Sequence, residues 1–273
     1  MIEQQKMIAR VRQICRDDER LVAALMYGSF TRDEGDTYSD IEFVLFFLDD
    51  VHHEVNPREW VGQIAPVEMY FINEFGNGTA IFSNLVRGEF HFDKASDMRQ
   101  VEGWKAAAWF PSLETTILVD RTGELTRLLQ PYALPPEHDT PEQVQTLCER
   151  FINWVMFGTN VMSRGEYARA LDLLGWVHRY LLWFARLSEG TTTHWPTPSK
   201  SLEPDISPAT YARFKTCTAS LDEHQLWQAY TNAWEWGKEL MSRQAEKHGI
   251  ALPANIIEAL DARIGALSNL RPL

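Results

Sequence analysis

Hydrophobic residues in the first half of the chain form two kinds of pattern, one with helical periodicity and one of uninterrupted apolar runs. Apolar residues recur at helical spacing over residues 2–15, which predicts an amphipathic opening helix. Continuous apolar runs over Leu21–Tyr27 and residues 41–48 predict two strands that are covered on both faces. The stretch from Gly28 to Ser39 between these runs is mostly polar and predicts a loop.

Shorter patterns between residues 57 and 129 predict further elements of a mixed sheet. The order of the signals is a short helix at 57–64, a hairpin of strands 67–72 and 79–86, an alternating strand at 89–92, a strand at 115–119 and a helix at 124–129. The residues Phe75-Gly76-Asn77-Gly78 are typical of the turn in such a hairpin.

The second half of the chain shows helical periodicity only. Three prolines within residues 130–139 indicate a domain boundary, and Thr140-Pro141-Glu142 is typical of a helix start. Helices are expected at 140–163, 167–187, 207–219, 222–247 and 254–268. The sequence therefore predicts an α+β protein, in which a mixed sheet with helices (residues 1–134) precedes an all-α helical bundle (residues 140–273).

Composition and charge indicate which kinds of ligand and which cell compartment to expect. The chain has 273 residues and a net charge of −12, which disfavours nucleic acid and favours cationic small molecules. The longest apolar run is too short to cross a membrane, and the polar N-terminus lacks a signal-peptide pattern, so a cytoplasmic protein is expected. Three widely spaced cysteines are interpreted as reduced and buried.

The loop between the two buried runs contains the residues that indicate chemistry. Asp40 and Glu42 stand two positions apart at the start of the second strand, so both side chains point to one face. Two neighbouring carboxylates repel each other unless a cation lies between them, and Mg²⁺ prefers such oxygen ligands. Gly28 and Ser29 form a turn whose backbone N–H groups can hold a phosphate. The combination predicts phosphoryl or nucleotidyl transfer. The alternative is that Glu42 has no chemical role and faces water on an edge strand.

Glu89 and His91 alternate with Phe90 and Phe92, which places the acid and the histidine on one face of a strand. A carboxylate on a strand beside the metal pair could bind metal or deprotonate an attacking hydroxyl. The residues alone do not decide between these two roles, nor do they exclude a strand that simply exposes a polar face to water. His91 is a candidate substrate contact.

These stretches together resemble a known family. The resembling segments are Met26–Thr31, Tyr38–Phe43, Arg87–Phe92 and Arg164–Arg169, and they span both halves. Gly-Ser, ten residues and then Asp-x-Glu is similar to the signature of the DNA-polymerase-β-like nucleotidyltransferases, in particular the lincosamide nucleotidyltransferases. The resemblance implies a nucleotidyltransferase-type sheet, Mg²⁺ on Asp40 and Glu42, nucleotide phosphate at Gly28 and Ser29, and Glu89 as general base.

The resemblance also implies a reaction, the transfer of AMP from ATP to a hydroxyl of a lincosamide antibiotic with release of pyrophosphate. Arg164 and Tyr167 are candidates to contact the nucleotide, and Tyr38 is a candidate wall of the substrate site. Related enzymes suggest a homodimer, for which the sequence contains no motif. Two alternatives stay open: a different acceptor, such as an aminoglycoside or a protein hydroxyl, and a non-catalytic, antitoxin-like binding protein.

Overall fold

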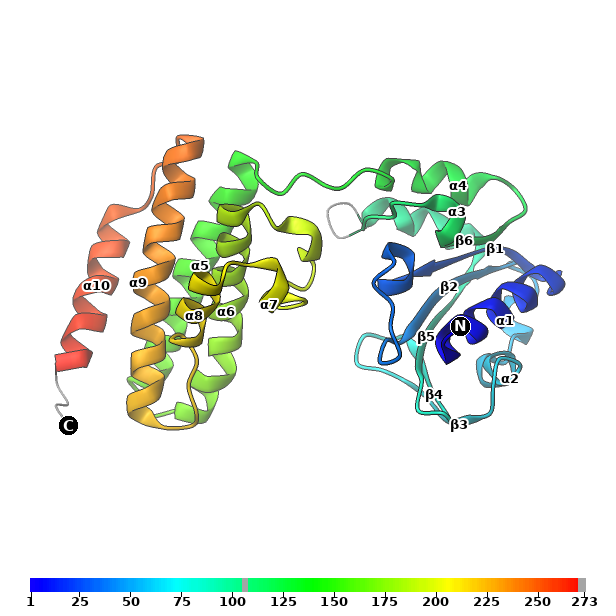
Figure 1. Cartoon of the computed structure of the whole chain (residues 1–273), viewed down its shortest axis with the longest axis horizontal. Coiled ribbons are helices and arrows are strands. Elements are labelled where there is room, and N and C mark those ends of the chain that lie inside the picture. Colours follow the sequence, from blue (N-terminus) through cyan, green and yellow to red (C-terminus); the bar gives the residue numbers. More distant parts are fainter. Residues whose placement is uncertain (105–107, 270–273) are drawn as a thin grey trace. The chain divides into compact units, whose positions relative to one another are not determined.

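The computed structural model describes residues 1–104 and 108–269, so the last four residues of the expected helical domain lie outside the described residues. The chain divides into two compact units, Met1–Pro136 and Glu137–Leu273 (Figure 1). The first unit combines a sheet with helices and the second is helical. These findings confirm the predicted α+β fold class.

A six-stranded mixed sheet forms the centre of the first unit. Its strands are β1 (Leu21–Tyr27), β2 (Ile41–Phe47), β3 (Val67–Ile72), β4 (Gly78–Phe82), β5 (Arg87–Lys94) and β6 (Ile117–Asp120). Their order in the sheet is β3-β4-β5-β2-β1-β6. The neighbours β2 and β5 run parallel, and the other neighbouring strands run antiparallel. The continuous apolar runs β1 and β2 therefore occupy inner positions, where both faces are covered.

Helices cover the two faces of this sheet unequally. On one face, α1 (Glu3–Asp17) and α2 (Pro57–Gly62) pack over all strands from β3 to β6, and Trp60 contacts the Phe90 ring. On the other face, the 3₁₀ segment η3 (Ala95–Gly103) and α4 (Glu124–Leu129) pack against β1 and β2. Among the described residues, the core cluster on this second face contains no side chain of β3, β4 or β5. Within the described residues of the first unit, the helical layer on this face therefore packs on β1 and β2.

The second unit is a bundle of long helices. Its helices are α5 (Pro141–Met162), α6 (Tyr167–Glu189), α7 (Leu202–Asp205), α8 (Pro208–Lys215), α9 (Glu223–His248) and α10 (Ala254–Asn269). The core lies between α5, α6 and α9, and Phe151 and Trp234 stack within it. The helix starts follow capping chemistry, since the side chains of Thr140 and Asp222 accept hydrogen bonds from backbone N–H groups in the first turns of α5 and α9.

Several predicted element boundaries are wrong; the alternating strand expected at 89–92, for example, spans Arg87–Lys94. The strand expected at 115–119 begins only at Ile117, because Ser112 caps the short helix α3 (Leu113–Thr116). The strand expected at 79–86 ends at Phe82, where the chain turns through Leu85 at a positive φ of 63°. The helices expected at 57–64 and 207–219 end at Gly62 and Lys215. Short 3₁₀ segments also interrupt the loops, namely η1 (Ser29–Arg32), η2 (His52–Glu54), η5 (Gln130–Tyr132) and η6 (Thr192–His194).

No helix within residues 1–104 and 108–269 combines the length and the apolar character that a membrane-spanning helix requires.

Candidate active site

Three sequence-predicted acids meet on one face of the sheet. In the register of β2 and β5, Glu42 lies opposite Glu89, and Tyr27 lies opposite Glu42 across β1 and β2. Residues that are directly opposite on neighbouring strands share a face, with Cβ atoms about 5 Å apart. Asp40 lies one residue before β2, beside Arg87 at the start of β5. The parallel pairing of β2 and β5 thus brings Glu42 beside Glu89, and it brings Asp40 beside Arg87, 47 residues away in sequence.

Glu89 is the most heavily hydrogen-bonded acid of this group. Its Oε1 accepts hydrogen bonds from the Tyr27 hydroxyl at 2.8 Å and from Asn77 Nδ2 at 3.0 Å. Its Oε2 accepts hydrogen bonds from Arg87 at 2.8 Å and from Asn73 Nδ2 at 3.2 Å. Only 14% of the Glu89 side chain is exposed. Four donors, one each from β1 and β5 and two from the turn between β3 and β4, therefore fix the orientation of this carboxylate.

Arg87 joins two of the acids. Its guanidinium donates to Asp40 Oδ2 at 2.6 Å and to Glu89 Oε2 at 2.8 Å. Burial lowers the pKa of Arg87, but these two carboxylates outweigh burial and raise it. The arginine therefore keeps its positive charge and reduces the repulsion between the neighbouring carboxylates.

The same contacts decide the charge state of Glu89. Partial burial raises the pKa of Glu89, but hydrogen bonds from Arg87, Tyr27 and Asn77 outweigh burial and hold the pKa below its usual value. The Tyr27 hydroxyl responds in the opposite direction, because burial and the nearby charges of Glu89 and Glu42 raise its pKa. At neutral pH the site therefore contains an ionised Glu89 and a protonated Tyr27.

The Gly28-Ser29 turn lies directly against Glu42. Gly28 has a φ of 80°, and a Cβ atom at this position would lie 1.6 Å from Glu42 Oε2. Only glycine permits both the backbone conformation and the approach of the carboxylate. The Thr31 hydroxyl closes the turn by donating to the Gly28 carbonyl at 2.7 Å. The predicted phosphate turn and the predicted metal acids are thus neighbours.

The donor set fits a magnesium ion that arrives with a nucleotide. Within residues 1–104 and 108–269, no three His, Cys, Asp or Glu side chains are grouped so that they alone could hold a metal. Mg²⁺ commonly uses one or two carboxylates and completes its shell with water and substrate phosphates. Asp40 and Glu42 are such a pair of carboxylates. Glu42 lies against the Gly28 turn, and Arg87 provides positive charge at Asp40 in the free protein.

The remaining sequence-predicted residues fall in different places. His91 Nε2 lies 3.0 Å from the Tyr27 hydroxyl, on the same face as Glu89. Tyr38 is 95% exposed in the loop before β2. Arg164 and Tyr167 belong to the second unit, at the turn between α5 and α6. There Arg164 pairs with Glu166, and Tyr167 packs against the helical core.

Four residues of the carboxylate cluster were not predicted as site residues, namely Tyr27, Asn73, Asn77 and Arg87. Tyr27 ends a run that is otherwise wholly apolar, and Arg87 stands two positions before Glu89. In the sequence, Tyr27 thus adjoins the Gly28-Ser29 turn and Arg87 adjoins the candidate base, so both positions offered a signal. The two asparagines carried no such signal, because only the hairpin brings them to Glu89.

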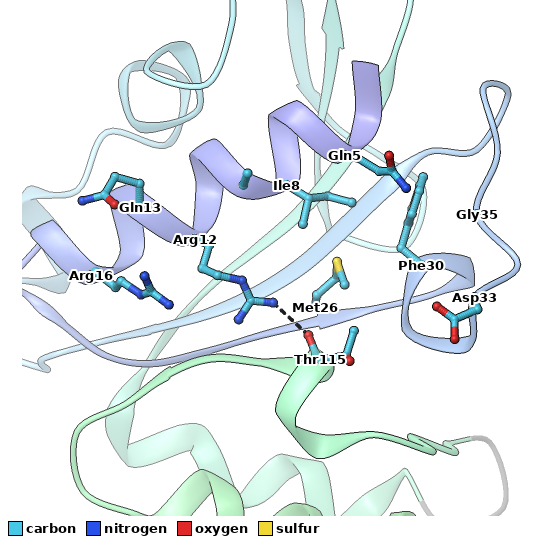
Figure 2. Close-up of a pocket in the computed structure, with 11 residues that line it drawn as sticks. Gln5, Ile8, Arg12, Gln13, Arg16, Met26, Phe30, Asp33, Gly35 and Thr115 are labelled. Carbon is cyan, nitrogen blue, oxygen red and sulfur yellow. Dashed lines mark hydrogen bonds between the residues drawn. The ribbon is translucent and has the colours of Figure 1, made fainter. Parts of the chain in front are cut away.

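A cavity of about 500 Å³ lies on the opposite face of the sheet (Figure 2). Its walls include Met26, which belongs to the core beneath α1, together with Phe30 of η1. In Figure 2, Arg12 points from α1 toward Thr115, whose carbonyl accepts a hydrogen bond from it at 3.0 Å. None of the candidate acids lines this cavity, so it is separate from the carboxylate cluster.

Comparison with known proteins gives one family match. Residues 140–263 match the model of the lincosamide nucleotidyltransferase-like C-terminal domain. No curated protein matches the chain significantly. The matched segment covers most of the helical unit, whereas the candidate acids lie in the first unit, outside the match.

Two solved structures show distant similarity. An aminoglycoside 6-adenyltransferase from Bacillus subtilis has 13% identity and a TM-score of 0.44, with 98% of this chain and 100% of that chain covered. A nucleotidyltransferase-like protein from Exiguobacterium sibiricum has 15% identity and a TM-score of 0.37, with 98% and 90% covered. At these scores, neither similarity indicates the substrate of this chain.

Proposed function

We propose that this protein is a magnesium-dependent nucleotidyltransferase that moves AMP from ATP to a hydroxyl of a lincosamide antibiotic. The observation that carries the proposal is the row of Tyr27, Glu42 and Glu89 beside the Gly28 turn, with Asp40 adjacent. The match of residues 140–263 to a lincosamide nucleotidyltransferase-like domain supports the same substrate class.

In this proposal, Asp40 and Glu42 hold the metal, and the Gly28-Ser29 turn contacts the phosphates. A bound Mg²⁺ would neutralise phosphate charge and orient the α-phosphate. The acceptor oxygen bonds to the α-phosphorus, the bond to pyrophosphate breaks, and Glu89 takes the proton of the acceptor hydroxyl. Arg164 and Tyr167 are proposed nucleotide contacts, and Tyr38 and His91 are proposed substrate contacts.

The hydrogen bonds of Glu89 affect both its basicity and the access of the acceptor hydroxyl to its oxygens. Because its pKa is lowered, Glu89 is ionised and able to accept a proton at neutral pH, but its basicity is reduced. These four donors occupy its two oxygens in the free protein. The acceptor hydroxyl must therefore replace one of these donors, and the two asparagine N–H groups make the longest of the four hydrogen bonds, at 3.0 and 3.2 Å.

The test is a direct assay of transfer. The protein is incubated with ATP, Mg²⁺ and lincomycin, clindamycin or an aminoglycoside in parallel, and the products are analysed by mass spectrometry. The proposal predicts an AMP adduct on the lincosamides and release of pyrophosphate. An adduct on the aminoglycoside alone would show that the acceptor is an aminoglycoside and that the proposed transfer of AMP is correct. Absence of any adduct, together with absence of Mg-ATP binding in calorimetry, would favour a non-catalytic binding protein.

A further inference from the structure

An exposed apolar strip lies on the same sheet face as the carboxylates. Across β3, β4 and β5, Phe71 lies opposite Thr79, and Thr79 lies opposite Glu89. Phe71, Thr79, Glu89, Glu42 and Tyr27 therefore form one continuous row over five strands, all on one face.

A second row runs parallel to the first. Met69 lies opposite Ile81, and Ile81 lies opposite Arg87, which contacts Asp40. Each row is thus charged at the centre of the sheet and apolar at the β3 edge. We call Met69, Phe71 and Ile81 the β3 strip.

The strip is open to solvent. Met69 is 56% exposed and Phe71 is 41% exposed. The layer formed by η3 and α4 covers β1 and β2 on this face but, among the described residues, no side chain of β3 or β4 belongs to its core. Exposed apolar surface that adjoins a polar site is typical of a ligand-binding surface.

The hairpin that carries the strip also holds Glu89. Asn73 and Asn77, at the turn between β3 and β4, donate to the two oxygens of this carboxylate. Asn73 also fixes the turn, since its Oδ1 accepts hydrogen bonds from the backbone N–H groups of Phe75 and Asn77. A molecule seated on the β3 strip therefore rests on the element that orients the proposed base.

We propose that the β3 strip is the subsite that binds an apolar group of the acceptor. The inference rests on the proposed function and specifies the chemistry of the acceptor. Two strand spacings separate Phe71 from Glu89, so the apolar group lies roughly 10 Å from the reacting hydroxyl. The acceptor is therefore an amphipathic molecule with an alkyl or aromatic group at that distance, and a wholly polar polycation leaves the strip unused.

The strand supplies a matched control for the test. Ile72 is 62% exposed and follows Phe71 directly, so its side chain points to the opposite face. The variants Phe71→Ala, Met69→Ala and Ile72→Ala each remove exposed apolar surface from the same edge strand. Circular dichroism and thermal melting of each full-length variant verify that the fold is retained.

The assay measures AMP transfer to lincomycin under steady-state conditions. Phe71→Ala is expected to raise the KM for lincomycin about tenfold, the effect of losing a partly buried aromatic contact. Met69→Ala should raise it less, because the contact is smaller. Neither variant should change the KM for ATP, and Ile72→Ala should change neither constant.

Several results would overturn the inference. Equal KM values for lincomycin in Phe71→Ala, Ile72→Ala and the unmodified protein would reject the subsite but would not affect the proposed transferase activity. A change of sedimentation coefficient in Phe71→Ala would assign the strip to an interface between two copies. Absence of transfer in the unmodified protein would instead reject the proposed function itself, and the subsite with it.

Discussion

At the scale of single residues, the three acids of the candidate site differ in the groups that they contact. Asp40 contacts Arg87, Glu42 lies against the Gly28 turn, and Glu89 accepts hydrogen bonds from four side chains. These environments support different roles, because a metal ligand must be accessible to a cation, whereas a base must be oriented toward the acceptor.

The first prediction separates metal ligands from base. Asp40→Asn and Glu42→Gln should abolish nearly all turnover and weaken Mg-ATP binding, since each removes a charged ligand at constant shape. Glu89→Gln should leave Mg-ATP affinity largely intact and lower kcat by roughly 10²–10⁴, the usual contribution of a positioned base. Calorimetry and steady-state kinetics measure the two effects. If Glu89→Gln loses nucleotide binding as completely as Asp40→Asn, Glu89 is a third metal ligand.

The pH dependence of transfer offers a second test of Glu89. Its pKa is held below the usual value, so activity should persist on acidification and fall only as the pH drops through that lowered pKa. Removing one donor with Asn77→Ala should shift the acid limb of the pH–kcat profile to higher pH. An acid limb that is identical in the two proteins would contradict the assignment of Glu89 as base.

Gly28 provides a third prediction at this scale. Gly28→Ala places a methyl group on the position now held by Glu42 Oε2 and on a backbone with φ of 80°. The expected cost is about 1–3 kcal/mol in the free energy of unfolding, with loss of Mg-ATP binding because Glu42 is displaced. Urea unfolding and calorimetry measure both effects. Gly76→Ala is the matched control, since its φ is also positive but no atom lies within 4 Å of the added methyl group.

At the scale of elements, close helix packing in the second unit depends on small residues. A Cβ atom on Gly237 of α9 would lie 2.0 Å from the Phe151 ring of α5, whereas one on Gly175 of α6 would meet no atom within 4 Å. The two glycines have the same intrinsic helix propensity but opposite packing surroundings.

The fourth prediction follows from this contrast. Gly237→Ala should destabilise the protein by about 1–3 kcal/mol through overpacking. Gly175→Ala should stabilise it by about 0.5–1 kcal/mol, because alanine restricts the unfolded chain and the added methyl group meets no obstacle. Urea unfolding monitored by circular dichroism measures both changes. Equal signs for the two substitutions would show that α5 and α9 do not pack as described.

Most element positions were predictable because periodicity is a local property. The strand Leu21–Tyr27 and the helix Glu124–Leu129 were predicted at their observed bounds. The errors occurred where one side chain or one backbone angle ends an element, as at Ser112 and Leu85. Such events change the structure without changing the hydrophobic pattern.

At the scale of the whole molecule, carboxylates in both units are stabilised in their charged form. In the helical unit, burial raises the pKa of Asp205, but hydrogen bonds from Arg186 and His194 outweigh burial and lower it. Arg186 is fully buried and also donates to the backbone carbonyls of Thr191, Pro198 and Lys200. Asp120 shows a lowered pKa in the first unit, where hydrogen bonds from Thr126 and neighbouring backbone groups outweigh burial.

The fifth prediction concerns acid unfolding. A carboxylate with a lowered pKa in the folded state stabilises the fold above its unfolded pKa of about 4, and this stabilisation is lost as the pH falls through the folded pKa. Urea unfolding between pH 7 and pH 3 should show this loss. Asp205→Asn should lower stability at pH 7 by about 1.5–3 kcal/mol, the usual value of a hydrogen bond to a charged group, and reduce the further loss on acidification. An unchanged slope would contradict the role of Asp205.

The sequence by itself determined the order of strands and helices, the change to a helical second half, and the placing of Asp40 and Glu42 on one face. These features follow from side-chain periodicity and local turn chemistry. Only the tertiary structure decided that β5 pairs in parallel with β2, which sets Glu89 opposite Glu42. It also decided that Arg87, Tyr27 and two asparagines surround Glu89, and that Phe71 extends the same row. Strands pair through backbone hydrogen bonds, which every residue except proline can form in full, so the hydrophobic pattern of one strand does not identify its partner strand.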